Sequence, residues 1–396
     1  MRFQTGFVIA ALALAACKKT KSEGQPPPDP TPGSSSGKPT EGSGSAAVAG
    51  SAAGSDVPPS VPLAGEGLAK FYVACLARIN AGKLDDYKRD CIDPEIAVHD
   101  VDSDEFTGAD SVIGYYTDMR KAMPDFKLEP QLVLVSGRNI LAITLMTGKQ
   151  TGPLKAQAGE LKASDKTVGM LTLHHVKTND DNKATEEWEY SDNKTMLGQL
   201  GLLPKEQGAT RAPLAAAAPP IVLVTKDDAK ETSNLDLVHK GDDAFNAHKS
   251  GDLVALWADD ANESDQASDK DNKGKAAIEG NLKGLFSAFP DVKIQVPNAF
   301  AAGDYVIVEG KLTGTHKGAL GPIKPTNKQV EISYAEVFKV KDGKIAEVTR
   351  FRNDMAMAAQ LGLLGETPKD APKDAPKAPP KQTPKDPPKE APKGGW

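Results

Sequence analysis

Two stretches of this 396-residue chain are similar enough to align as a repeat, which constrains the fold more than any other feature. They read MPDFKLEPQLVLVSGRNILAITLMTGKQTGPL at residues 123–154 and FPDVKIQVPNAFAAGDYVIVEGKLTGTHKGAL at 289–320, aligned without a gap at an offset of 166. A shorter motif, QLGLL, recurs at 199–203 and 360–364. A repeat of this length predicts two copies of one domain, which we place at residues 63–205 and 228–365 with a linker at 206–227.

Each copy begins with a helical pattern and continues with strand-like runs. Apolar residues recur at helical spacing from Leu68 to Ile79, and a proline ends a second helix at residue 124 or 290. Strand-like runs follow at residues 128–135, 140–147, 168–177 and 185–192 of the first copy and at 330–340 and 345–352 of the second. Helices followed by a meandering antiparallel sheet predict the α+β class.

Proline is concentrated outside the two copies. Of the 30 prolines, nine lie between Pro26 and Pro62 and nine between Pro368 and Pro392. Residues 18–62 are rich in Pro, Gly, Ser and Ala, and residues 366–396 repeat a Pro-Lys pair, so we expect both segments to be disordered. The tail is either a solvated, semi-rigid extension or a weak contact for an anionic envelope polymer. A net charge of −6 argues against a nucleic-acid partner.

Residues 1–17 resemble the signal peptide of a bacterial lipoprotein. A positive start at Arg2 precedes an apolar run, residues 7–16, that is too short to span a membrane. The sequence LAAC at residues 14–17 resembles the lipobox, in which the cysteine thiol receives a diacylglycerol. Cys17 would then anchor the protein to the bacterial cell envelope, and Lys18 is typical of sorting to the outer membrane in some bacteria. An ordinary secretory signal with a chance cysteine is the alternative.

Motifs in both copies point to one family. The second copy contains FPD, a GD turn, TGTHKG, DGKIAEV and QLGLL, and the first contains MPD, TGKQTG, ATEEWEYSDNKTML and QLGLLP. Their order and spacing resemble SnoaL-like polyketide cyclases of the nuclear transport factor 2-like superfamily, which also holds ketosteroid isomerase. The resemblance implies two tandem cones, each a curved antiparallel sheet wrapped by helices with an apolar pocket at its mouth. Such cones include enzymes, binding proteins and scaffolds, so the fold alone does not decide function.

The first copy matches the acid/base residue of the family. In SnoaL-like cyclases an aspartate on the last strand is the general acid/base, and Asp192 matches it. Alternation along the strand puts Trp188, Tyr190 and Asp192 on one face. If that face lines the pocket, burial raises the pKa of Asp192 toward that of a proton shuttle, and His174 on the preceding strand can assist it. Alternatively, Asp192 caps the helix that starts near Lys194, and His174 is an ordinary core or surface residue.

The second copy departs from the family at this position. It has Asn353 on the strand face of Phe351, and an amide cannot shuttle a proton near neutral pH. The second domain is therefore expected to bind a ligand or to support the first. Further candidates for polar pocket residues in the second copy are Glu336 and His316, and exposed loop or edge positions are the alternative for both. In the first copy, His99 is a candidate for the rim of the pocket.

Cys75 and Cys91 remain after Cys17 is assigned to lipid. They lie on two short predicted helices that can pack together, so an oxidising envelope allows a disulfide, and two buried free thiols are the alternative. The second copy has no cysteine, so the fold does not require the bridge. The histidines lack the spacing of zinc motifs, and no phosphate-binding loop or nucleophile elbow is present, so we expect neither metal nor cofactor.

These features predict a lipid-anchored envelope protein whose cones bind a small, largely apolar molecule. One alternative is a cyclase or isomerase that acts through Asp192 and His174. Another is a non-catalytic interaction module, because this superfamily often dimerises through its sheet. That pairing would occur between the two domains of one chain or in a homodimer.

The lipobox predicts that Cys17 carries acyl chains in cells. Wild-type protein from cells grown with a palmitate analogue should be labelled and should fractionate with membranes. Cys17→Ser should be unlabelled, because the thiol is the point of attachment. Equal labelling of the two proteins would contradict the assignment.

Overall fold

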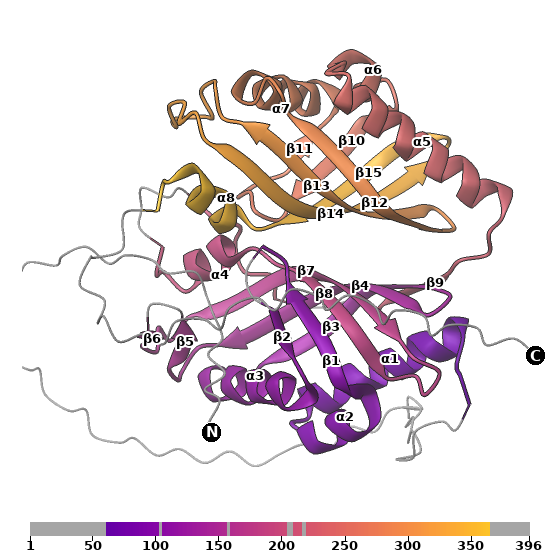
Figure 1. Ribbon diagram of the computed structural model, residues 1–396, viewed down its shortest axis with the longest axis vertical. Coiled ribbons are helices and arrows are strands. Elements are labelled where there is room, and N and C mark those ends of the chain that lie inside the picture. Colours follow the sequence, from indigo (N-terminus) through magenta and orange to yellow (C-terminus); the bar gives the residue numbers. More distant parts are fainter. Residues whose placement is uncertain (1–60, 103–104, 157–158, 204–208, 216–218, 365–396) are drawn as a thin grey trace, which may run out of the picture.

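The computed structural model describes residues 61–102, 105–156, 159–203, 209–215 and 219–364. These residues form two α+β domains, each with helices against one face of a curved sheet (Figure 1). The predicted lipobox, the N-terminal spacer and the Pro-Lys tail lie outside the described residues. In the described part of the chain, no helix is long and apolar enough to cross a membrane.

The first domain is built around a sheet with strand order β2-β1-β8-β7-β4-β3-β9. Its helices are α1 (Gly65–Asn80), α2 (Leu84–Cys91), α3 (Ala109–Ala122) and α4 (Asn193–Gln199). Its strands are β1 (Ile92–Asp100), β2 (Glu105–Thr107), β3 (Lys127–Ser136), β4 (Asn139–Lys149), β5 (Leu154–Ala156), β6 (Gly159–Leu161), β7 (Thr167–Thr178) and β8 (Ala184–Tyr190). The short strands β5 and β6 pair separately, and β1 runs parallel to β8.

The second domain repeats this arrangement, with strand order β11-β10-β15-β14-β13-β12. Its helices are α5 (Ala229–Asn246), α6 (Ser250–Val254), α7 (Lys275–Ala288) and α8 (Asp354–Leu361). Its strands are β10 (Trp257–Asp265), β11 (Asn272–Lys273), β12 (Lys293–Ala302), β13 (Tyr305–Thr315), β14 (Gln329–Lys341) and β15 (Lys344–Arg352). Strand β10 runs parallel to β15, as β1 does to β8.

One asparagine in each domain fixes the first helix to the sheet. The amide of Asn80, the last residue of α1, donates to Leu128 O and accepts from Leu128 N, at 2.8 Å each. Asn246, the last residue of α5, makes the same pair of bonds to Ile294. Asn80 and Asn246 are 166 positions apart, and so are the prolines that follow α3 and α7. Adding 166 to a residue number of the first domain therefore gives the equivalent position of the second, in the helices and in the strand pairs β3–β4 and β12–β13.

The segment predicted as a linker is partly built into the fold. Residues 221–224 form strand β9 (Ile221–Val224), which pairs in parallel with β3 at the edge of the first sheet. Leu214 N donates to Gly169 O, and a Cβ at Gly169 would lie only 2.0 Å from Leu214 O. The chain can cross β7 so closely only because residue 169 has no side chain.

The two sheets pack face to face, with α1, α2 and α3 on the outer side of the first and α5, α6 and α7 on the outer side of the second (Figure 1). The central strands have one face toward their own helices and one toward the other domain, which is why most of them are apolar on both faces. Fully buried side chains at this interface, such as Leu134 and Ile307, each stabilise the structure by about 1.5–3 kcal/mol. The buried cluster consists of Leu132, Leu134, Leu141, Ile143, Leu173, Tyr190, Ala302, Ile307, Ala335, Val337 and Phe351.

Hydrogen bonds between the domains fix how the two sheets are placed relative to each other. Near one end, His175 Nδ1 lies 2.8 Å from Glu309 Oε2, and both side chains are buried. Elsewhere, Ser333 N donates to Asp102 Oδ2 at 2.8 Å, and Thr225 Oγ1 donates to Ala301 O at 2.8 Å. These polar contacts are directional, so they allow fewer relative placements of the sheets than apolar packing alone.

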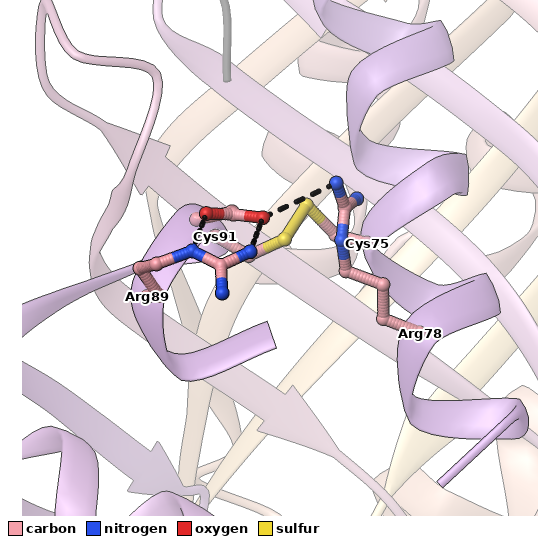
Figure 2. The surroundings of a disulfide bond; sticks show 5 residues. Cys75, Arg78, Arg89 and Cys91 are labelled. Carbon is pink, nitrogen blue, oxygen red and sulfur yellow. Dashed lines mark hydrogen bonds and ion pairs between the residues drawn. A yellow bond between two sulfur atoms is a disulfide. The ribbon is translucent and has the colours of Figure 1, made fainter. Parts of the chain in front are cut away.

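A disulfide joins α1 to α2 on the outer side of the first domain (Figure 2). Cys75 and Cys91 have their Cα atoms 5.9 Å apart, so the bridge, and not the pair of free thiols, is the state of these cysteines. Beside it, the buried carboxylate of Asp90 accepts two hydrogen bonds from Arg89 and lies 3.4 Å from Arg78 Nη2. The bridge and the ion pairs together hold the two short helices against the cone.

Candidate functional site

The second domain contains a cavity of about 360 Å³ between its sheet and its helices. A cavity of this size falls in the range of small-molecule sites. Most of its wall is apolar, and the larger side chains in that wall are Phe245, Trp257, Leu282, Phe289, Ile332 and Phe338. Two helix α7 glycines, Gly280 and Gly284, also border the cavity, and a Cβ at either would meet no atom within 4 Å.

The first domain has only about 30 Å³ of space in the corresponding cone. Tyr72, Tyr87 and Tyr116 border this space, and their buried rings occupy much of the remaining interior of the cone. At the offset of 166 the second domain has Val238, Leu253 and Leu282 in their place. Gly241 replaces Cys75 of the disulfide in the same way. The two cones therefore share a fold and differ in whether a molecule larger than water fits inside.

The base of the second cone carries an ion-pair network centred on two arginines of β15. Arg350 lies 2.5 Å from Glu336 Oε1 and 2.9 Å from Glu263 Oε1. Arg352 Nη2 lies 2.9 Å from Asp265 Oδ2, and Arg352 Nη1 binds Asp354. Three strands, β10, β14 and β15, and the first residue of α8 thus meet at a single charged cluster under an apolar cavity.

Burial and neighbouring charges shift the pKa values of this cluster. Burial raises the pKa of Glu336, although Arg350 opposes the shift. Burial also acts to raise the pKa of Asp265, but Arg352 and Arg350 outweigh it and lower that pKa. On α5, burial and the nearby Glu336 raise the pKa of Asp242 to about 6. Asp265 therefore stays ionised, whereas Asp242 and Glu336 hold protons more readily than ordinary carboxylates.

Tyr334 adds a polar group without a partner to the same cavity. Its ring lies across Gly310 of the neighbouring strand, where a Cβ would come within 2.6 Å of the tyrosine Oη. The hydroxyl is buried and has no hydrogen-bond partner among the described residues. Thr144 and Thr172 occupy these two positions in the first domain. The glycine thus makes room for a ring whose hydroxyl has unused hydrogen-bonding capacity.

The first cone encloses a different polar group. His174 Nδ1 lies 2.8 Å from Glu187 Oε1, and its Nε2 lies 2.8 Å from Thr172 Oγ1. Burial acts to lower the pKa of His174, but Glu187 and Glu189 outweigh it and raise that pKa. Both ring nitrogens are occupied by protein groups, so His174 is a partnered core residue of a nearly filled cone.

The structure corrects the predicted orientation of the last strand. Tyr190 belongs to the interface cluster, and the Trp188 ring lies 5.1 Å from His99 and from His175, outside both cavities. Phe351 of the second domain is likewise an interface residue. The aromatic face of each strand is covered by the other sheet, and the charged face points into the cone. The expectation that these aromatic side chains line a pocket was therefore wrong.

Asp192 lies on the same face as Tyr190, toward the other domain, and borders neither cavity. Its carboxylate accepts from Thr195 N at 2.8 Å and from Thr195 Oγ1 at 2.7 Å, as the cap of α4. Its other oxygen accepts from Asp354 N of the second domain at 3.0 Å. Asn353 caps α8 in the same way, through Met355 N. The two positions are thus matched helix caps at the domain interface, and the structure does not bring Asp192 together with His174.

The other predicted residues divide between the cavity and its surroundings. Glu336 lines the second cone. His316 is buried behind the cavity wall, with its ring 5.2 Å from that of Phe289 and its Nδ1 bound to Thr326. His99 stacks on Trp188 at the end of β1 and lies 3.1 Å from Glu105. Neither histidine lines either of the two cavities described above.

Sequence reasoning missed five polar residues of the second cone. The sequence pattern that could have identified them is the alternation of Arg350 and Arg352 along β15, opposite Glu336. The prediction instead placed the other face of this strand, with Phe351, in the pocket. The missed residues are Asp242, Glu263, Asp265, Arg350 and Arg352. Among the described residues, no group of His, Cys, Asp or Glu side chains is arranged to hold a metal ion.

Comparison with protein families decides the family. The model of the SnoaL-like polyketide cyclase family matches residues 66–200 and 236–361. The chain belongs to this family. The two tandem SnoaL-like domains predicted from the repeat are confirmed, as is the α+β class. A search of curated proteins finds no significant match to the chain.

Three solved structures resemble parts of the chain. AclR from Streptomyces galilaeus is 24% identical, with 35% of this chain and 87% of AclR covered and a TM-score of 0.32. IdmH from Streptomyces antibioticus is 26% identical, with 33% and 98% covered and a TM-score of 0.30. A SnoaL-like polyketide cyclase from a Jannaschia species is 21% identical, with 35% and 96% covered and a TM-score of 0.33.

The buried carboxylate of Asp192 predicts a pH-dependent stability. Burial and the nearby Asp354 raise its pKa from 3.8 to about 6, so its contribution to stability is complete below about pH 4 and is lost as the pH rises through about 6. Relative to Asp192→Asn, the free energy of unfolding of the wild type should therefore fall by about 3 kcal/mol between about pH 4 and pH 8. Urea unfolding at a series of pH values measures this difference.

The same substitution at Asp228, an exposed cap of α5, controls for the loss of a capping carboxylate. A wild-type advantage over Asp192→Asn that grows with pH would show that the carboxylate is stabilised in its charged form and would contradict this assignment.

Proposed function

We propose that the second SnoaL-like domain is the ligand-binding part of the protein and takes a small molecule with a largely apolar body. The observation that carries this proposal is the contrast between cavities of about 360 Å³ and 30 Å³ in two copies of one fold. The first domain then acts as the structural partner that covers the outer face of the second sheet.

The lining of the second cone supports binding of an apolar body. Aromatic and aliphatic side chains form the wall, while the charged residues are gathered at the base. A ligand that fills such a cavity gains about 25 cal/mol for each Å² of apolar surface removed from water. The polar base then orients the ligand, because only a group that can pair with the cluster is tolerated there.

Catalysis through Asp192 has little geometric support. A general acid or base must lie within hydrogen-bond reach of its substrate, and Asp192 is instead bound to two backbone N–H groups at the domain interface. A role as a proton shuttle fits Asp242 better, because it borders the cavity and its pKa is about 6. An isomerase or cyclase reaction is therefore the second candidate function, now in the second domain.

We further propose that the protein is held at the bacterial envelope through Cys17. Its support is the LAAC sequence together with the Pro-, Gly- and Ser-rich spacer at residues 18–62. A flexible spacer of that length has a root-mean-square span of about 35–40 Å. Both cones would then stand clear of the membrane, and the second could collect its ligand from the periplasm or from the membrane surface.

Filling the second cone with tyrosine should abolish ligand binding. The double variant Val238→Tyr, Leu282→Tyr copies the two tyrosines of the first cone, so its cavity should no longer admit a probe. The measurement is the fluorescence of N-phenyl-1-naphthylamine, which is uncharged at neutral pH. The wild type should enhance the fluorescence with a saturable dependence on probe concentration, and the double variant should not.

Lys240→Tyr adds a ring to the exposed side of α5 and serves as the matched control, with binding expected to be unchanged. Undiminished enhancement by the filled variant, with its folding confirmed by circular dichroism, would place the probe elsewhere and refute the proposed site. The absence of any probe binding by the wild type would count equally against it.

A further inference from the structure

The cavity of the second cone has more carboxylates than the protein itself neutralises. Its ionisable lining residues are Asp242, Glu263, Asp265, Glu336, Arg350 and Arg352. Both guanidinium groups are fully engaged, Arg350 with Glu263 and Glu336 and Arg352 with Asp265 and Asp354. An anionic ligand would therefore have to compete with carboxylates already bound to each arginine. The carboxylates that no arginine neutralises can instead pair with a positively charged group of a ligand.

Asp242 is the carboxylate least satisfied by the protein. Its one hydrogen-bond partner among the described residues is His239, one turn earlier on α5, at 3.3 Å, and that imidazole is about half exposed. Glu336 is shared, since Arg350 binds its Oε1 and no described side chain binds its Oε2. The two carboxylates also repel each other, because Glu336 is close enough to help raise the pKa of Asp242. A cation between them would relieve that repulsion.

The hydroxyl of Tyr334 is an independent sign of a missing polar partner. It is about 94% buried, borders the same cavity and makes no hydrogen bond to the described residues. Leaving a buried hydroxyl unsatisfied costs free energy, so such groups usually have a water or ligand partner. The phenol oxygen can accept a hydrogen bond from an N–H group while the two carboxylates supply the negative charge.

The apolar wall also suits a cation with a hydrophobic body. The rings of Phe245, Trp257 and Phe338 border the cavity, and aromatic faces attract ammonium groups through their quadrupoles. A purely neutral ligand would leave the surplus carboxylates desolvated and unpaired in the occupied cavity.

We propose that the ligand of the second cone is an amphiphilic amine, whose protonated nitrogen binds Asp242, Glu336 and the hydroxyl of Tyr334 while its apolar body fills the cavity. This inference rests on the proposed function and specifies the chemical class of the ligand. It assigns Arg350 to holding Glu336 in place rather than to binding an anion.

Three probes with the same adamantane body test the charge of the ligand. They are 1-adamantylamine, which is protonated at pH 7, the neutral 1-adamantanol, and adamantane-1-carboxylate. Isothermal titration with the full-length protein should give an affinity for the amine about tenfold or more above that for the alcohol. The carboxylate should bind more weakly than either.

Asp242→Asn removes one charge without touching an arginine. The substitution should weaken binding of the amine by about tenfold and leave the affinity for the alcohol unchanged. Asp236→Asn makes the same change at an exposed position of α5 and should affect neither probe. This pair of variants separates a direct contact from a general change in the charge of the domain.

The outcomes separate the two proposals. Equal affinity for amine and alcohol, with no effect of Asp242→Asn, would overturn the amine assignment and leave the apolar cavity standing. Tighter binding of the carboxylate would overturn it in favour of the arginines. Binding of none of the three probes, together with no binding of N-phenyl-1-naphthylamine, would instead refute the cavity as a ligand site.

Discussion

The face-to-face packing of the two sheets is the interaction on which the rest of the structure depends. It buries the outer face of both sheets, including Tyr190 and Phe351, in one continuous apolar cluster. Once that face is taken, only the face toward the helices remains for a ligand. The packing therefore determines that the last strand of the second domain directs Arg350 and Arg352 into the cone, and that the helix caps Asp192 and Asn353 lie between the domains.

Within this frame the two copies have diverged in a complementary way. The first cone is filled by tyrosines and closed over by a disulfide, which stabilises a loop of this length by about 3 kcal/mol. The second cone has smaller residues at those positions, glycines on α7 and a charged base. A cavity and a buried ion-pair network both cost stability. The filled first domain, which shares a core with the second, helps to offset that cost.

The sequence predicted the repeat, the fold class and six strands close to their observed bounds, because long runs of apolar residues define them. Among the strands it missed are β1 and β10, whose sequences IDPEIAVHD and WADDANESD have their apolar residues interrupted by acidic residues. In β10 the apolar pattern is broken because Glu263 and Asp265 point into the cone. The wrong face was chosen for β8 and β15 because alternation gives two faces but not what covers each. That information lies in the packing of the other domain.

The central claim is that only the second cone is open, while the first cone and the space between the sheets are filled. Diffraction from a crystal pressurised with xenon tests this directly, because xenon enters apolar cavities that are large enough to hold it. The account predicts xenon density in the second cone, beside Val238 and Leu282, and none in the first cone or between the sheets. Xenon beside Tyr72 and Tyr116, or an empty second cone, would contradict it.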